Sequence, residues 1–130
     1  MVCLETTFLI DLLRGSESVR KLSEEFTETE GSLAAASPAI MEVWRGAIAE
    51  KAKNGEKLRA TKLFQSLNVL PLDGKSAMEA AVIELELKKE GITVDIEDIM
   101  IAAIARANGE KLVTRDAHYA KISGLQLIKY

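Results

Sequence analysis

Five carboxylates in this 130-residue sequence lie at or shortly after the ends of short apolar segments, and together they suggest metal-assisted chemistry. They are Glu5, Glu42, Asp95, Asp98 and Asp116. If they converge, they stay ionised only beside a cation, because two like charges about 4 Å apart repel by about 4 kcal/mol at an effective dielectric of about 20. Oxygen ligands without Cys or paired His select hard ions such as Mg²⁺ or Mn²⁺. Such a cluster typically supports in-line attack of water on a phosphodiester.

Each acid also has a structural explanation. Glu42 lies about opposite an apolar stripe in its helix, which favours a solvated position; the stripe consists of Ile40, Val43, Trp44, Ala47 and Ile48. Asp95 and Asp98 are spaced as capping acids at a helix start, although Asp98 precedes the most apolar helix. Asp116 is consistent with capping the turn "AHYA". Glu5 is the hardest to explain, because it ends an apolar strand and is followed by two threonines and no Lys or Arg.

The elements that position these acids alternate between strand and helix. Short strands are predicted at residues 2–5, 32–37, 68–72, 111–114 and 125–130. Helices are predicted at residues 8–14, 16–30, 37 to about 53, 56–67, 73–90 and 96–108. This alternation predicts a single α/β domain over residues 1–130, with a mainly parallel, roughly five-stranded sheet flanked by helices. Such sheets bind ligands at the carboxyl ends of their strands, where Glu5 and Asp116 are expected.

Composition limits the other possibilities. The chain is 48% hydrophobic and 28% charged, which is typical of one globular domain. Its single cysteine, Cys3, allows no internal disulfide and favours a reducing, cytoplasmic setting. We expect no signal peptide and no membrane span, because Glu5 stands where positive charge is usual and no apolar run is long enough. The net charge of −3 argues against broad nonspecific adhesion to nucleic acid.

Several segments resemble the PIN domain family in their order and spacing. "LETTFLIDLLRG" resembles the family's opening, in which an acid is followed by Thr, a small polar residue, apolar residues and a second acid. "SPAIMEVWRG" is similar to the segment that carries the helix glutamate. "DIEDIMIAAIARANGEKLVTRD" is similar to the third and fourth acidic segments, and "HY" stands where His-Phe is common. A stand-alone domain of this size most resembles the VapC toxins of prokaryotic VapBC pairs, which are Mg²⁺-dependent ribonucleases.

This resemblance implies a PIN-like three-layer domain and assigns roles to individual residues. The catalytic acids would be Glu5, Glu42, Asp98 and Asp116. The ligands of Mg²⁺ or Mn²⁺ would be Glu5, Asp98 and Asp116. The supporting residues would be Thr6, Thr7, Asp95 and Thr114. Candidates for contact with RNA phosphates, or alternatively plain surface charges, are Arg14, Arg45 and Arg115. The expected partners are an RNA substrate, a small antitoxin and a second copy of the chain.

One departure from the family pattern leaves the activity open. The first acid is ordinarily Asp, whereas this chain has Glu5, which is longer by one methylene. On a rigid strand the difference shifts a metal ligand by about 1 Å, and misplacement on that scale costs on the order of 100-fold in rate. The alternative function is therefore an impaired PIN module that binds RNA or a protein. A phosphoryl-accepting receiver domain shares the architecture but fits poorly, because the chain lacks the paired acid after strand one and the later Lys.

Overall fold

A parallel sheet forms the centre of the computed structural model, which describes residues Met1–Tyr130. Its strands are β1 (Val2–Leu4), β2 (Leu33–Ala36), β3 (Asn68–Leu70), β4 (Lys111–Thr114) and β5 (Leu127–Lys129). They lie in the order β3-β2-β1-β4-β5, and every pair is parallel. The predicted α/β fold with a five-stranded parallel sheet is confirmed. The receiver alternative is wrong, because receiver-like sheets have the order 2-1-3-4-5.

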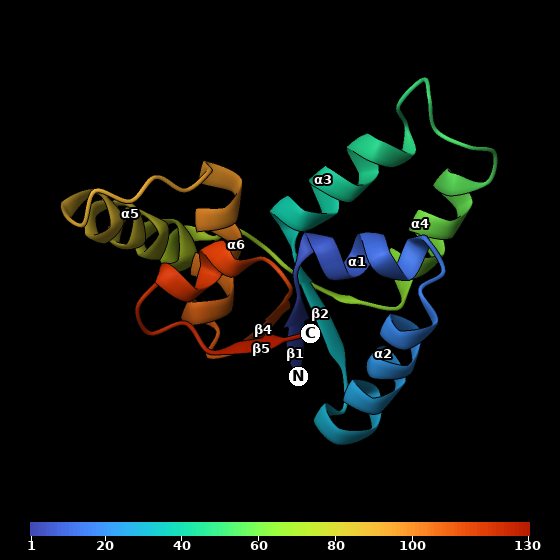
Figure 1. Cartoon of the computed structure of the whole chain (residues 1–130), viewed down its shortest axis with the longest axis horizontal. Coiled ribbons are helices and arrows are strands. Elements are labelled where there is room, and N and C mark those ends of the chain that lie inside the picture. Colours follow the sequence, from blue (N-terminus) through green and yellow to red (C-terminus); the bar gives the residue numbers. More distant parts are fainter.

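Helices connect the strands and cover both sides of the sheet. The helices are α1 (Thr6–Leu13), α2 (Glu17–Glu30), α3 (Ser37–Ala47), α4 (Glu56–Gln65), α5 (Gly74–Lys89) and α6 (Ile96–Ala107). A short 3₁₀ helix, η1 (Ala117–Lys121), follows β4. Figure 1 shows α5 and α6 grouped on one side of the sheet, with α1, α2 and α4 grouped on the other. None of the helices has the length and apolar character needed to cross a membrane.

Local sequence signals explain most helix boundaries. Helix α2 begins after Ser16, whose hydroxyl accepts from the backbone N–H of Val19, and it ends at Gly31, whose φ of 82° suits glycine. Helix α5 begins with a capping box in which Asp73 and Ser76 bond reciprocally. Helix α3 carries Pro38 in its first turn.

The predicted end of the third helix at about residue 53 is wrong, because α3 ends at Ala47. The stripe that suggested a longer helix is not buried along its length. Ile48 is 51% exposed and Trp44 is 36% exposed, whereas Val43 and Ala47 are buried. A further turn would therefore have had no apolar surface to pack against, and packing supplies most helix stability in proteins.

The core and the strand order together define where a site can form. All three residues of β1 are fully buried, and α6 contributes a continuous buried run from Ile101 to Ala105. After β1 the chain winds outward to β2 and β3, and it then crosses back to β4 on the other side of β1. Connections diverge at this reversal, so a crevice is expected outside the carboxyl ends of β1 and β4.

Candidate active site

Glu5 follows the last residue of β1 and is the most strongly held acid of the crevice. It is 3% exposed, and its side chain caps the N-terminus of α1 by accepting from the backbone N–H of Thr7 at 3.0 Å. The same oxygen, Oε2, also accepts from the hydroxyls of Thr7 and Thr114. No Lys or Arg pairs with Glu5, so this buried carboxylate is stabilised by neutral donors alone.

Asp98 lies in the first turn of α6, and its side chain lies close to that of Glu5 because both contact the hydroxyl of Tyr119. Its Oδ1 accepts from the hydroxyl of Tyr119 at 3.0 Å, and that hydroxyl lies 3.4 Å from Oε1 of Glu5. Burial and then the charges of Glu5, Asp116 and Asp95 raise the pKa of Asp98, whereas the bond from Tyr119 lowers it. Burial and the same negative surroundings raise the pKa of Tyr119, so its hydroxyl remains a donor.

Glu42 lies near the other acids and is only partly exposed to solvent. It is half-buried, and its Oε1 accepts from the hydroxyl of Thr6 at 3.3 Å, because α1 packs against α3. Burial is the main reason that the pKa of Glu42 is raised, and the charge of Asp98 adds to it. The helical pattern placed Glu42 correctly opposite the stripe, but the side of α3 opposite the stripe faces the other acids.

Asp116 caps η1, as its structural explanation anticipated. Its Oδ1 accepts from the backbone N–H of His118 at 2.9 Å and lies 2.8 Å from the Nδ1 of that residue. The backbone N–H of Asp116 donates to the hydroxyl of Thr114, which in turn donates to Glu5. A single threonine therefore links the turn that carries Asp116 to the acid at the end of β1.

The four acids share one pattern of hydrogen bonding. In each, protein donors hold one oxygen: Oε2 of Glu5, Oε1 of Glu42, Oδ1 of Asp98 and Oδ1 of Asp116. The other oxygen has no bond from a protein donor, except for the long contact from Tyr119 to Glu5. Asp95 differs, because it stands at the N-cap of α6 without a side-chain capping bond and acts on Asp98 through its charge.

The oxygen ligands that this site offers suit a hard divalent cation. All the ligand candidates are carboxylate oxygens, and their mutual repulsion contributes to the raised pKa values of Asp98 and Glu42. The predicted ligand trio of Glu5, Asp98 and Asp116 does not form a complete group, since no three Asp, Glu, His or Cys side chains converge closely enough. Mg²⁺ commonly uses only one or two carboxylates and keeps several waters. Glu5 and Asp98, which contact the same hydroxyl, are therefore the pair best placed to hold it.

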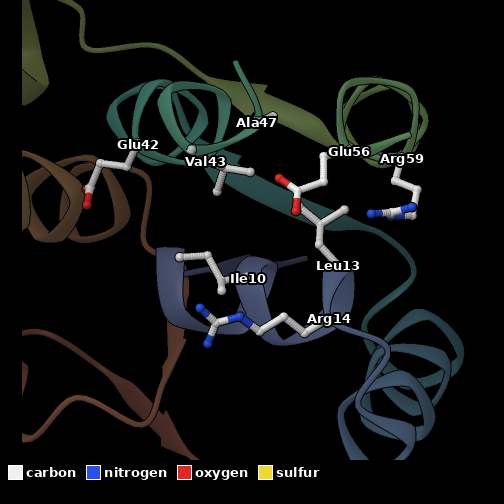
Figure 2. Close-up of a pocket in the computed structure, with 9 residues that line it drawn as sticks. Ile10, Leu13, Arg14, Glu42, Val43, Ala47, Glu56 and Arg59 are labelled. Atoms are coloured by element: carbon white, nitrogen blue, oxygen red, sulfur yellow. The ribbon is translucent and has the colours of Figure 1, made fainter. Parts of the chain in front are cut away.

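A groove leads away from the acids between α1, α3 and α4. Glu42 and Val43 line it together with Ile10, Leu13, Arg14, Gly46, Ala47, Glu56 and Arg59. Figure 2 shows Glu42 at one end of the groove and Arg59 at the other, with Arg14 extending along α1 near Ile10. Neither arginine forms an ion pair, whereas Arg20 and Arg106 do.

The three arginines predicted for RNA contact have different surroundings. Arg14 lines the groove, and Arg45 is exposed on α3 outside it. Arg115 is occupied, because its Nε donates to Asp11 at 2.9 Å. Asp11 also accepts from the hydroxyl of Tyr130 at 2.8 Å, so it forms part of a structural network. Arg59, which the sequence reasoning did not select, lies at the far end of the groove from Glu42.

Sequence reasoning also missed Tyr119. The available signal was a tyrosine three residues after Asp116, in the "HY" segment that stands where the PIN family commonly has His-Phe. Nothing in the local pattern shows that its hydroxyl reaches two acids more than 20 residues away along the chain.

Comparison with known proteins shows the family of the chain. A family model described as "PIN domain" matches residues 2–125. Ribonuclease VapC5 of Mycobacterium tuberculosis is 26% identical over 109 residues, which are 84% of this chain and 81% of that protein. A VapC ribonuclease of Pyrococcus furiosus is 35% identical over 65 residues, which are 50% of this chain and 44% of that protein. The latter match therefore spans less than half the length of the Pyrococcus protein.

Solved structures show the same arrangement of elements. A DNA-bound VapBC complex from Salmonella typhimurium has a chain that superposes with a TM-score of 0.89 at 26% identity, covering 99% of this chain and 98% of that one. A chain of the VapBC2 complex from Rickettsia felis superposes with a TM-score of 0.91 at 20% identity, covering 100% and 99%. The match to the family model extends over nearly the whole sheet and includes all four acids. The chain belongs to the PIN domain family.

Proposed function

We propose that the protein is a divalent-cation-dependent endoribonuclease that acts as the toxin of a toxin–antitoxin pair. The observation that carries this proposal is the set of four carboxylates near the reversal of the sheet. Protein donors hold one oxygen of each, and the other oxygen is free of them except for the long contact from Tyr119 to Glu5. Support comes from the similar proteins, which are named VapC ribonucleases, and from the similar structures, which are VapBC complexes.

In this proposal Glu5 and Asp98 hold Mg²⁺ or Mn²⁺, and Asp116, on the turn after β4, adds negative charge beside Asp98. When bound, the cation supplies Lewis acidity toward a phosphate and a water of lowered pKa. Thr7 and Thr114 keep the Glu5 carboxylate pointed into the crevice, and Thr6 does the same for Glu42. Asp95 adds negative charge beside Asp98 and strengthens the attraction for a cation. Glu42 lies where the groove meets the acids, so its Oε2 can accept a hydrogen bond from water near the scissile phosphate.

The groove is the proposed path of the RNA strand. Arg14 and Arg59 are free of ion pairs and lie along it, so they can contact phosphates on one side of the cleaved bond. Arg45 is exposed on α3 and is a weaker candidate, while Arg115 would first have to leave Asp11. By the same resemblance we expect a small antitoxin partner, a homodimer and a cytoplasmic location.

The test uses purified protein free of any partner and a panel of short single-stranded RNAs. Cleavage should require Mg²⁺ or Mn²⁺, stop on chelation and fall by at least about 100-fold in Asp98→Asn. Glu84→Gln is a matched control, because it removes one negative charge from α5, at a residue whose only ion pair is to Lys88. Cleavage that survives both chelation and Asp98→Asn would exclude the mechanism.

The impaired PIN module remains the second candidate, and Glu5 is the observation that favours it. Glu5→Asp keeps the capping bond to Thr7, since Asp is a good N-cap residue, but its shorter side chain retreats from Thr114. If Glu5 supports full activity, Glu5→Asp should show no gain in Mn²⁺ affinity or in cleavage. A gain of about 10-fold or more in cleavage would favour the impaired module.

A further inference from the structure

The hydroxyl of Tyr119 occupies a central position between two of the acids. Its oxygen lies 3.0 Å from Oδ1 of Asp98 and 3.4 Å from Oε1 of Glu5, so the two carboxylate oxygens are separated by no more than the sum of these distances. The side chain is 1% exposed, and its ring belongs to the core of the domain. A phenol has a single proton, and the shorter distance assigns it to Asp98.

Asp98 depends on Tyr119 more than Glu5 does. Three donors fix Oε2 of Glu5, and they come from α1 and β4. By contrast, the only protein donor to Asp98 is the hydroxyl of Tyr119. The direction of the Asp98 carboxylate is therefore fixed by one hydrogen bond.

The position of Tyr119 is itself set by the acids on the other side of the site. Thr114 donates to Glu5 and accepts from the backbone N–H of Asp116, and Asp116 caps the turn of η1 that carries Tyr119. The ring is then locked by burial in the core. A continuous set of contacts runs from Glu5 through this turn to Asp98, although the two acids belong to β1 and α6.

We propose that Tyr119 is a positioning residue, whose hydroxyl holds Oδ1 of Asp98 so that Oδ2 faces the cation site beside Glu5. This inference rests on the proposed function, since it assigns Tyr119 a role toward the same ion. Removing an outer hydrogen-bond partner of a metal ligand typically weakens metal binding by about 10- to 100-fold. Tyr119→Phe removes only the hydroxyl and keeps the ring, so it separates the positioning role from core packing.

The experiment measures Mn²⁺ affinity by titration calorimetry, with electron paramagnetic resonance of free Mn²⁺ as a second readout. Tyr119→Phe should bind Mn²⁺ about 10-fold more weakly than the unaltered protein. In the Asp98→Asn background the same substitution should change the affinity by less than about twofold, because the residue through which Tyr119 acts is already altered. Tyr130→Phe is the matched control: it removes a hydroxyl that donates to Asp11 at 2.8 Å and only approaches the Thr7 hydroxyl at 3.4 Å. Because Thr7 keeps both of its own bonds to Glu5, this variant should change the affinity by less than about twofold.

Replacement of Tyr119 by 4-aminophenylalanine provides a rescue, since the amino group still donates to Asp98. This variant should recover most of the Mn²⁺ affinity, and it keeps the test decisive if Tyr119→Phe folds poorly. Unchanged or tighter binding in a folded Tyr119→Phe variant would overturn the positioning role while leaving the proposed nuclease intact. Failure of the unaltered protein to bind Mn²⁺ would instead overturn the proposed function and this inference with it.

Discussion

Replacing Thr114 with valine should destabilise the protein, because the buried Thr114 hydroxyl makes two hydrogen bonds at the end of β4. Thr114 is 1% exposed, and its hydroxyl donates to Oε2 of Glu5 at 3.0 Å while accepting from the backbone N–H of Asp116 at 3.0 Å. Valine has nearly the same shape but provides neither bond. Thr114→Val therefore removes one buried and one partly buried hydrogen bond without creating a cavity.

The magnitude follows from the two groups that lose a partner. A hydrogen bond to a charged group contributes about 1.5 to 3 kcal/mol, and the lower end applies because Glu5 keeps two bonds from Thr7. A backbone N–H left without a partner costs about 1 to 3 kcal/mol, reduced where water reaches the half-buried Asp116. We expect the free energy of unfolding to fall by about 2 to 4 kcal/mol.

The assay is urea unfolding followed by circular dichroism, in a buffer that contains a chelator. Thr114→Ser is the matched control, because it retains the hydroxyl and removes one buried methyl group, which costs about 1 kcal/mol. The slope of the free energy against urea should be the same in all three proteins. A Thr114→Val variant no less stable than Thr114→Ser would show that these two hydrogen bonds do not support the site.

Three further predictions concern other parts of the molecule. The hydrogen bond from Arg115 holds the pKa of Asp11 below its usual value. Ionised Asp11 therefore stabilises the fold above the unfolded-state pKa of Asp11, and this stabilisation is lost as the pH falls through the folded-state pKa. Asp11→Asn should therefore lower the melting temperature at pH 7, and the difference should shrink as the pH is lowered and Asp11 becomes protonated; a difference that does not change with pH would contradict this. Burial raises the pKa of Cys3 to about 12, so iodoacetamide at pH 8 should modify it only in urea, and rapid modification of the folded protein would refute its burial. Arg59→Gln should weaken RNA binding and reduce the slope of log affinity against log salt by about 0.7, whereas Arg20→Gln on α2, already ion-paired, should not.

The sequence predicted those parts of the fold that depend on local patterns. The strands, most helix boundaries and the parallel sheet follow from apolar runs, cap residues and the alternation of strand and helix. The placement of Glu5 at the end of β1 and of Asp116 after β4 follows from the same patterns. The sequence also indicates that hydroxyl groups hold Glu5, because two threonines follow it directly.

Contacts between distant segments could not be predicted in this way. The apolar stripe of its helix predicts a solvated Glu42, and only the packing of α1 against α3 brings Thr6 to it. The role of the Tyr119 hydroxyl depends on α6 and η1 meeting across the end of the sheet. The premature end of α3 depends on where the core stops, which a helical stripe does not show.

In each of the four acids, the oxygen that accepts bonds from the protein supports the fold, whereas the negative charge of the carboxylate is what a cation needs. Asparagine and glutamine keep an oxygen that can accept the bonds made by Thr6, Thr114 and Tyr119, so an amide replacement keeps the internal scaffold while removing the charge. Under the proposed function, such a substitution would abolish cleavage and leave the folded surface of the domain in place.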